Sequence, residues 1–278
     1  MDDSKQAYDD NGYLFPIDVF SPPEVARARA SLEQIEQRSP VNLAHPISLY
    51  LRTAAHISFP FVVEMARSKT LLDTVETILG ENIMIYSAEF FIKEAGSEKI
   101  VTWHQDLTYW GLGETDDELT AWIALSDVNV KSGCMRFVPG SHKQRIQPHK
   151  DSFAADNLLS RGQEVAVAVD EDAAVDIELK PGQVSLHHGR MFHASGPNRS
   201  DQRRIGLVIR YITPEVEQSG VPGYAMMARG IDTSGNWHHF APPCENFDPR
   251  NLALYETVRG DQQKVLMRGA AQKSKVYV

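Results

Sequence analysis

The spacing of apolar residues along the chain changes from helical to extended near residue 80. After Ser21, apolar residues recur every three or four positions, which is the period of a helix with one buried face. These residues are Val25, Ala28, Leu32 and Ile35. Ser21 and Glu24 stand where a capping box would start this helix. The segment 68–79 repeats the pattern up to Gly80, a C-cap signal. The sequence therefore predicts a helical N-terminal part, about residues 1–80.

Short segments rich in β-branched and aromatic residues follow, and Gly, Pro, Asp and Ser separate them. These segments are 82–93, 118–128, 134–138, 164–169, 174–179, 182–188 and 204–212. Their number and spacing predict a sandwich or a barrel, with a core at about 82–212. Helices followed by strands indicate an α+β fold that is mainly β. The remainder, 213–278, has a loop-rich composition, and such loops often cover a binding site. We expect one domain over residues 1–278.

Composition and charge narrow the classes of partner. The chain has 28 basic and 37 acidic residues and a formal net charge of −9, which disfavours a nucleic acid as the partner. Cys134 and Cys244 lie far apart, so a disulfide framework and a cysteine-rich zinc site are excluded and a reducing compartment is indicated. No apolar run approaches the roughly 20 residues of a membrane helix, and the polar N-terminus has no secretory signal. We expect a small-molecule substrate, no membrane partner and a cytoplasmic location.

Candidate chemistry begins at WHQDLTYW, residues 103–110, where His104 and Asp106 stand one residue apart among aromatic residues. Burying such a polar pair costs free energy unless something binds it. On a strand, residues two apart point to the same face, so both side chains can face one interior point while Gln105 faces away. A second pair, His149 and Asp151, lies in a charged, polar stretch, where we expect a solvated loop.

A metal site needs a third ligand, and His193 in GRMFHASGPNRSDQRR is the best candidate. Two imidazoles and one carboxylate on one face form the facial triad of non-haem Fe(II) oxygenases. His187 or His188, at the end of the preceding segment, is an alternative third ligand, and zinc is an alternative metal for the same residues. Arg204 follows His193 by eleven positions, and a guanidinium beside a metal is suited to a bidentate grip on a carboxylate.

The chain resembles the phytanoyl-CoA dioxygenase family of Fe(II)- and 2-oxoglutarate-dependent oxygenases over most of its length. The resemblance rests on NGYLFPIDVFSPPEVARARA, WHQD, SGCMRFVPGSHK and HHGRMFHASGPNRSDQRRIGLVIRY, in that order. It implies a double-stranded β-helix, a jelly-roll or cupin-like core, with flanking N-terminal helices. It also implies iron ligands at His104, Asp106 and His193, and Arg204 on the far carboxylate of 2-oxoglutarate.

The same resemblance implies further contacts and a reaction. Ser195, Trp122 and Lys93 stand where family members often contact the co-substrate, although Trp122 can equally be a core aromatic and Lys93 a strand-end lysine. Halogenating relatives have a small residue in place of the carboxylate. Because Asp106 is present here, the resemblance implies hydroxylation or another oxidation with dioxygen rather than halogenation.

The substrate is less well determined by the sequence. Tyr109, Trp110 and Trp237 can form an aromatic wall, which would suit a cationic group or an apolar chain and is also typical of core packing. The segment WHQDLTYWG is similar to that of bacterial relatives that hydroxylate small aminophosphonates, which implies a compact zwitterion such as an aminophosphonate or a betaine. The candidate basic groups for a phosphonate are Arg52, Arg136, Arg190 and Arg210.

Three alternatives stay open at the level of sequence. The first is a jelly-roll binding or sensing protein that keeps a metal without catalysis. The second is a zinc-dependent hydrolase or isomerase on a cupin-like barrel, and the third is a hydroxylase of a lipid acyl-CoA or a natural-product scaffold. The triad together with Arg204 argues against the first, because a pure binder has no need of a co-substrate clamp.

Overall fold

The helices of the N-terminal part lie where the periodicity predicts them. The computed structural model describes residues 3–37, 43–270 and 272. Helix α2 (Pro22–Gln37) buries the four predicted apolar residues, and the Ser21 N–H donates to Glu24 Oε2 over 2.7 Å, which is one half of a capping box. Helix α6 (Lys69–Leu79) ends at Gly80, as predicted. The shorter helices are α1 (Asp3–Asn11), α3 (Ile47–Arg52), α4 (Ala55–Ser58) and α5 (Pro60–Ala66).

Two sheets form the body of the protein, and each predicted segment contributes a strand. Among the described residues, the larger sheet has seven strands in the order β1-β9-β4-β11-β2-β12-β13. The smaller has four, in the order β3-β10-β5-β8, and β6 and β7 form a separate hairpin. The larger sheet comprises β1 (Tyr13–Asp18), β2 (Ile83–Lys93), β4 (Glu118–Ala124), β9 (Gln183–His187), β11 (Arg204–Ile212), β12 (Tyr224–Arg229) and β13 (His238–His239). The other strands are β3 (Val101–His104), β5 (Met135–Phe137), β6 (His149–Asp151), β7 (Gln163–Val165), β8 (Val175–Ile177) and β10 (His193–Ser195).

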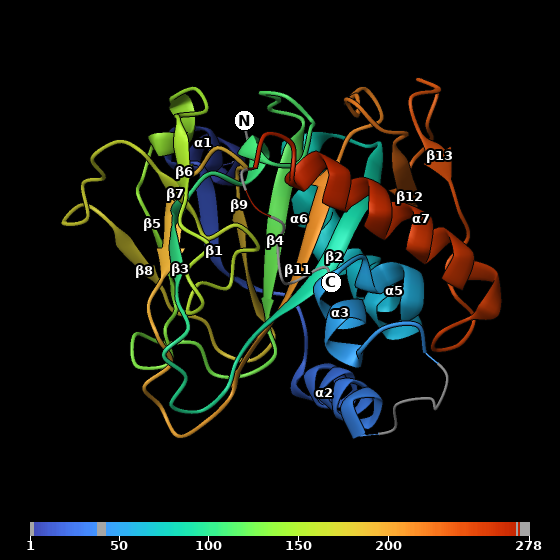
Figure 1. Ribbon diagram of the computed structural model, residues 1–278, viewed down its shortest axis with the longest axis horizontal. Helices are drawn as coiled ribbons and strands as arrows, with labels where there is room; N and C mark the ends of the chain where they lie inside the picture. The colour runs from blue at the N-terminus through green and yellow to red at the C-terminus, as the bar shows by residue number, and fades with distance from the viewer. Residues whose placement is uncertain (1–2, 38–42, 271, 273–278) are drawn as a thin grey trace.

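The larger sheet has helices on one face and the smaller sheet opposite its other face. Figure 1 shows the four-stranded sheet on the left, helices α2, α3 and α5 on the right, and strands β4 and β11 between them. The main core contains the helices' apolar residues and one face of β11, including Ile205, Leu207 and Ile209. On the opposite face, Trp122 and Val208 pack against residues of the smaller sheet, including Phe137. This face-to-face packing of two mainly antiparallel sheets is the predicted sandwich.

A bulge in β2 adjusts the residues that face the interior between the sheets. Arg210 of β11 pairs with Ser87, but its neighbour Tyr211 pairs with Ile85, so Tyr86 is an additional residue. An extra residue in one strand reverses the alternation of side chains beyond it. Ser87 pairs directly with Arg210, so Ser87 and Glu89 lie on the same face as Arg210 without the bulge, and the additional residue Tyr86 lines the same pocket.

The C-terminal part, residues 213–278, was predicted to be loop-rich, and this prediction is wrong for the long helix that it contains. Residues Pro249–Leu266 form helix α7, and the Asp248 side chain accepts the Arg250 N–H as an N-cap. Its buried residues recur at helical spacing but are separated by many polar residues, so the apolar pattern is weak. They are Asn251, Tyr255, Val258, Asp261 and Val265. Within the described part of the chain, no helix combines the length and the apolar character needed to cross a membrane.

We expect acid to destabilise the fold through His56 in α4. Its side chain is buried and has no hydrogen-bond partner among the residues that the structure describes, and burial lowers its pKa to about 3. An unfolded histidine has a pKa near 6.5. The neutral His56 ring therefore makes its full contribution to the free energy of unfolding above pH 6.5. This contribution is lost as the pH falls towards 3. Between pH 7 and pH 5 the loss amounts to about 2 kcal/mol.

Denaturant unfolding at pH 7 and pH 5 measures this effect. His56→Leu is expected to lose less stability than the parent chain over this interval, and the exposed His238→Ala variant serves as the control. The same pH dependence in His56→Leu and in the parent chain would rule out this origin of the acid sensitivity.

Candidate functional site

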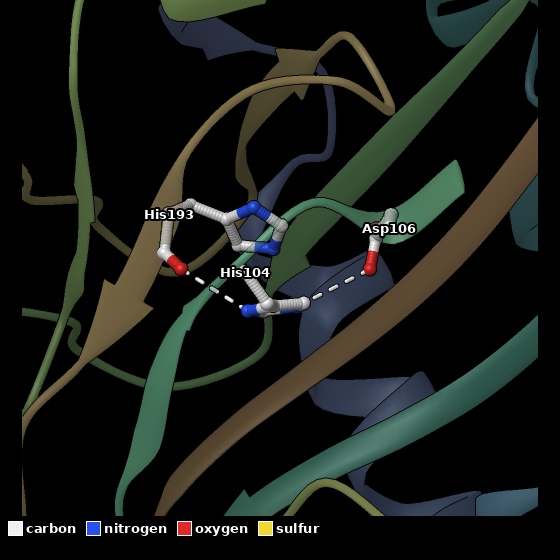
Figure 2. Close-up of side chains that lie close together, drawn as sticks. All are labelled: His104, Asp106 and His193. Carbon is white, nitrogen blue, oxygen red and sulfur yellow. Dashed lines mark hydrogen bonds and ion pairs between the residues drawn. The ribbon is translucent and has the colours of Figure 1, made fainter. Parts of the chain in front are cut away.

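Strand pairing brings the three predicted metal ligands together. His104 ends β3, Asp106 begins the 3-10 helix η1 (Asp106–Thr108), and His193 begins β10. Strands β3 and β10 are antiparallel neighbours in which His193 pairs directly with His104. One possible ligand atom from each of the three side chains lies within 4.8 Å of the other two, and all three residues are buried (Figure 2). The expectation that His104 and Asp106 share a strand is only half right, because the chain turns after His104.

Hydrogen bonds to the backbone fix the orientation of both imidazoles. His104 Nδ1 lies 2.9 Å from the Thr102 carbonyl oxygen and 3.1 Å from that of His193. His193 Nδ1 lies 3.0 Å from the Met191 carbonyl oxygen. Carbonyl oxygens only accept, so each Nδ1 carries the proton and each Nε2 has a free lone pair. Histidine ligands of metals are usually held in this way.

The carboxylate completes an electron-rich cluster. Burial alone would raise the pKa of Asp106, but interactions with His104 and His187 and the charge of Arg210 hold it well below the usual range. Burial lowers the pKa of His193 well below its usual value, so this imidazole is neutral. Asp106 Oδ1 lies 3.3 Å from His104 Nε2. Two imidazole nitrogens and a carboxylate oxygen that converge in this way are the donor set of a facial triad, so the residues fit a bound metal ion.

The alternative third ligands lie outside this cluster. His187 Nε2 is 3.8 Å from Asp106 Oδ2, and its ring is 4.9 Å from that of His193. His188 points elsewhere, with Nε2 3.1 Å from an oxygen of Asp116. The geometry therefore favours His193 as the third ligand and places His187 in the wall beside it.

A cavity of about 430 Å³ joins the triad to Arg204. The Arg204 side chain is 1% exposed, donates from Nη1 to the Gly133 carbonyl oxygen, and has no partner at Nε among the described residues. Burial lowers its pKa to about 10, so it remains charged at neutral pH. Trp122 and Ser195 also line this cavity, and the guanidinium carbon lies 5.4 Å from the Trp122 ring centre. The cavity thus has metal-binding groups at one place and an incompletely paired cation at another.

Lys93 stands behind this cavity. Its Nζ donates to Ser195 Oγ over 2.7 Å and to the Ser195 carbonyl oxygen over 3.3 Å. Burial, followed by the charge of Arg204, lowers its pKa to about 6. These contacts hold Ser195 in the cavity wall, so Lys93 acts on the site through its neighbour.

A second chamber of about 530 Å³ reaches the triad from another side. It shares His104 and Asp106 with the first cavity. Besides Asp106, its charged lining residues are Arg52, Glu89 and Arg210, and the other lining residues include Tyr109, Trp110 and Leu266. The chamber therefore combines both signs of charge with aromatic surfaces.

Arg210 is the best-anchored charge in this chamber. It forms an ion pair with Glu89 and donates to Ser87 Oγ over 3.1 Å, and its guanidinium carbon lies 4.3 Å from the Trp110 ring centre. Arg52 donates to the Leu158 carbonyl oxygen over 2.8 Å. In both arginines the Nε–H has no partner within the described chain. Two buried donors are thus available to an acceptor.

The remaining candidates from the sequence lie away from this chamber. Trp237 is 6% exposed and donates to the Val216 carbonyl oxygen over 2.8 Å within an apolar cluster. Arg136 pairs with Glu171, and Arg190 pairs with Asp116. Sequence reasoning did not identify Glu89, although an acidic residue inside the apolar segment 82–93 was a usable signal.

The second His-x-Asp pair is part of the site's support, and the prediction of a solvated loop there is wrong. His149 Nδ1 lies 2.8 Å from the Gln147 carbonyl oxygen, so it donates, and Nε2 accepts the Gln105 N–H over 3.1 Å. Burial lowers the pKa of His149 to about 4, which keeps the ring neutral for this bond. The polar stretch is ordered because it pairs with β7 as a hairpin. His149 therefore fixes the backbone between two triad residues.

Comparison with known proteins agrees with this geometry. The family model described as phytanoyl-CoA dioxygenase matches residues 8–206. A probable alpha-ketoglutarate-dependent hypophosphite dioxygenase of Stutzerimonas stutzeri is 30% identical over 75% of this chain and 77% of its own length. An L-proline trans-4-hydroxylase of Streptomyces griseoviridis is 27% identical over 75% of this chain and 85% of its own. The solved apo structure of the non-heme monooxygenase ThoJ superposes with a TM-score of 0.86 at 31% identity, over 96% of this chain and 98% of that one.

These matches confirm the predicted jelly-roll core. They also confirm, at the level of the family, the predicted enzyme class, a dioxygenase that uses Fe(II) and 2-oxoglutarate. A metal-binding protein without catalysis and a zinc hydrolase are disfavoured accordingly. The chain belongs to the phytanoyl-CoA dioxygenase family.

Proposed function

We propose that this protein hydroxylates a C–H bond of a compact zwitterionic small molecule, with His104, Asp106 and His193 as the iron ligands. The observation that carries the proposal is the position of the triad between two chambers, one ending at Arg204 and the other holding the Arg210–Glu89 pair. Iron(II) with 2-oxoglutarate and dioxygen supplies the oxidation: one oxygen atom enters the product alcohol and the other enters succinate, with release of carbon dioxide.

The first chamber suits the co-substrate. The free edge of Arg204 offers N–H donors to the far carboxylate, in a buried setting where a charged hydrogen bond is strong. The Trp122 ring lies beside this guanidinium, and Ser195 lines the same cavity. The ring limits where a flexible dicarboxylate can lie, which orients its other end towards the triad.

The second chamber suits a substrate that carries both charges. The free Nε–H groups of Arg52 and Arg210 are donors for an oxyanion such as a phosphonate or a carboxylate. Glu89 and the aromatic rings of Tyr109 and Trp110 suit a cationic group. A lining that combines both signs of charge with aromatic rings suits an aminophosphonate or a betaine better than the long apolar chain of an acyl-CoA.

The names of two of the relatives point in the same direction. Hypophosphite is a small oxyanion and proline a small zwitterion, and both names belong to relatives that cover about three quarters of this chain.

A cytoplasmic location is also part of the proposal, because Cys134 and Cys244 are free thiols.

Arg204→Ala is expected to raise the KM for 2-oxoglutarate at least tenfold, because a charged hydrogen bond contributes roughly 1.5–3 kcal/mol. Arg204→Lys should recover part of this loss, since lysine keeps the charge without the bidentate geometry. Succinate formation measured against 2-oxoglutarate concentration tests both variants, with the exposed Arg199→Ala as the control from the same loop. An unchanged KM in Arg204→Ala would place the carboxylate clamp elsewhere.

The substrate class is tested by succinate release that a candidate substrate stimulates. We expect stimulation by at least one of 2-aminoethylphosphonate, glycine betaine and L-proline, and none by palmitoyl-CoA. With the stimulating compound, Arg210→Met and Glu89→Gln should each raise its KM roughly tenfold, because each leaves one substrate charge buried without a partner. The KM for 2-oxoglutarate should stay unchanged.

Arg136→Met is the matched control for this experiment, because it removes an arginine whose partner Glu171 is on the surface. Stimulation by palmitoyl-CoA alone would overturn the proposed substrate class.

A further inference from the structure

We propose that Arg161 is a positioning residue that fastens the C-terminal end of helix α7 over the substrate chamber. The role of that chamber rests on the proposed function above. The fastening itself rests only on contacts among described residues, and it gives a purpose to the second His-x-Asp pair of the sequence.

Arg161 uses all three guanidinium nitrogens. The side chain is 10% exposed, with Nε donating to Asp151 Oδ1 over 3.0 Å and Nη2 donating to the other oxygen of the same carboxylate. Nη1 donates to the carbonyl oxygens of Leu266, over 2.8 Å, and Arg268, over 3.2 Å. Leu266 is the last residue of the helix and Arg268 follows it; the last carbonyls of a helix lack partners within the helix and carry partial negative charge, so a guanidinium is well suited to cap the Leu266 carbonyl.

The capped end of α7 is a wall of the substrate chamber. Leu266 lines the chamber together with His104, Asp106 and Tyr109. The Arg161 guanidinium carbon also lies 5.2 Å from the centre of the Tyr109 ring. One side chain thus contacts both the helix end and an aromatic wall of the chamber, and its loss would release both.

Arg161 is in turn fixed to the strand that carries His104. Its loop docks on β3: the Ile100 N–H donates to the Asp156 carbonyl oxygen over 2.8 Å, and the Leu158 N–H donates to the Ile100 carbonyl oxygen over 2.8 Å. Asn157 Nδ2 donates to Thr102 Oγ1 over 2.7 Å. The position of the α7 end is therefore set relative to the triad.

The rest of α7 is held by a different part of the protein. Tyr255 and Val258 belong to the main core, and the Tyr255 ring stacks on Tyr50 with centres 4.4 Å apart. Val265, near the end of the helix, is buried outside that core cluster. The two ends of α7 should therefore respond separately to mutation, which makes the fastening testable.

The first test is hydrogen–deuterium exchange of the full chain. In Arg161→Ala, backbone amides of residues 262–268 are expected to exchange about tenfold faster, since two charged hydrogen bonds to that segment are lost. Amides of 252–258 should be unchanged, and Arg161→Lys should fall between. Arg250→Ala is the matched control, because it removes an arginine–aspartate pair at the opposite end of the same helix and should leave 262–268 unchanged.

The second test separates positioning from simple stabilisation. With the compound that stimulates succinate release, Arg161→Ala should raise its KM about fivefold or more and increase the succinate formed per product molecule, with an unchanged KM for 2-oxoglutarate. The double variant Asp151→Arg with Arg161→Asp restores the ion pair, but a carboxylate cannot donate to the helix carbonyls. We therefore expect no rescue of KM or of exchange.

Wild-type exchange at 262–268 in Arg161→Ala, or full rescue by the double variant, would overturn the proposal. The exchange experiment needs no substrate. It therefore tests whether Arg161 holds the end of α7 even if no compound of the panel stimulates turnover.

Discussion

The antiparallel pairing of β3 with β10 is the constraint on which the rest of the site depends. It sets His193 directly opposite His104, although 88 residues lie between them in the sequence. The turn after His104 then adds the Asp106 carboxylate, and backbone carbonyls hold both imidazoles with Nε2 free. Because these bonds come from the backbone, the donor set is organised before any metal binds, which reduces the ordering that binding must supply.

Strand β11 organises what surrounds the metal ligands. Arg204 and Arg210 are six residues apart on one strand face, which corresponds to about 20 Å. Gly206 lies between them, and a Cβ at this position would come within 2.0 Å of the Trp122 ring, so only glycine leaves room for that ring. One strand therefore presents two guanidinium groups to the site, with the triad across from it: Arg204 lines the first cavity, and Arg210 lines both. Both guanidinium groups are in this way held by the same rigid element.

The sequence predicts the structure well where a residue pattern depends only on local structure, such as the spacing of apolar residues along a helix. Helical spacing located α2 and α6, and the motif order predicted three side chains that the structure does bring together. Prediction from the sequence failed where tertiary contacts decide the role of a residue. The sequence shows that Trp237 is aromatic but not whether it lines a chamber or a core, and this residue lies in an apolar cluster. His149 lies in a polar stretch, and only the pairing of that stretch with β7 gives the residue a structural role. Helix α7 was missed because its buried face alternates with many charged residues. Burial of Lys93 behind Ser195 likewise depends on strand register, which spacing along the chain does not encode.

The central claim is that His104, Asp106 and His193 bind a ferrous ion that 2-oxoglutarate also reaches. Anaerobic addition of Fe(II) and 2-oxoglutarate tests it most directly, because a bidentate keto acid on Fe(II) gives a visible metal-to-ligand charge-transfer absorption. We expect this absorption in the parent chain and in His187→Ala, and its loss in His193→Ala. A parent chain without the absorption, or a His193→Ala variant that keeps it while His187→Ala loses it, would contradict the account.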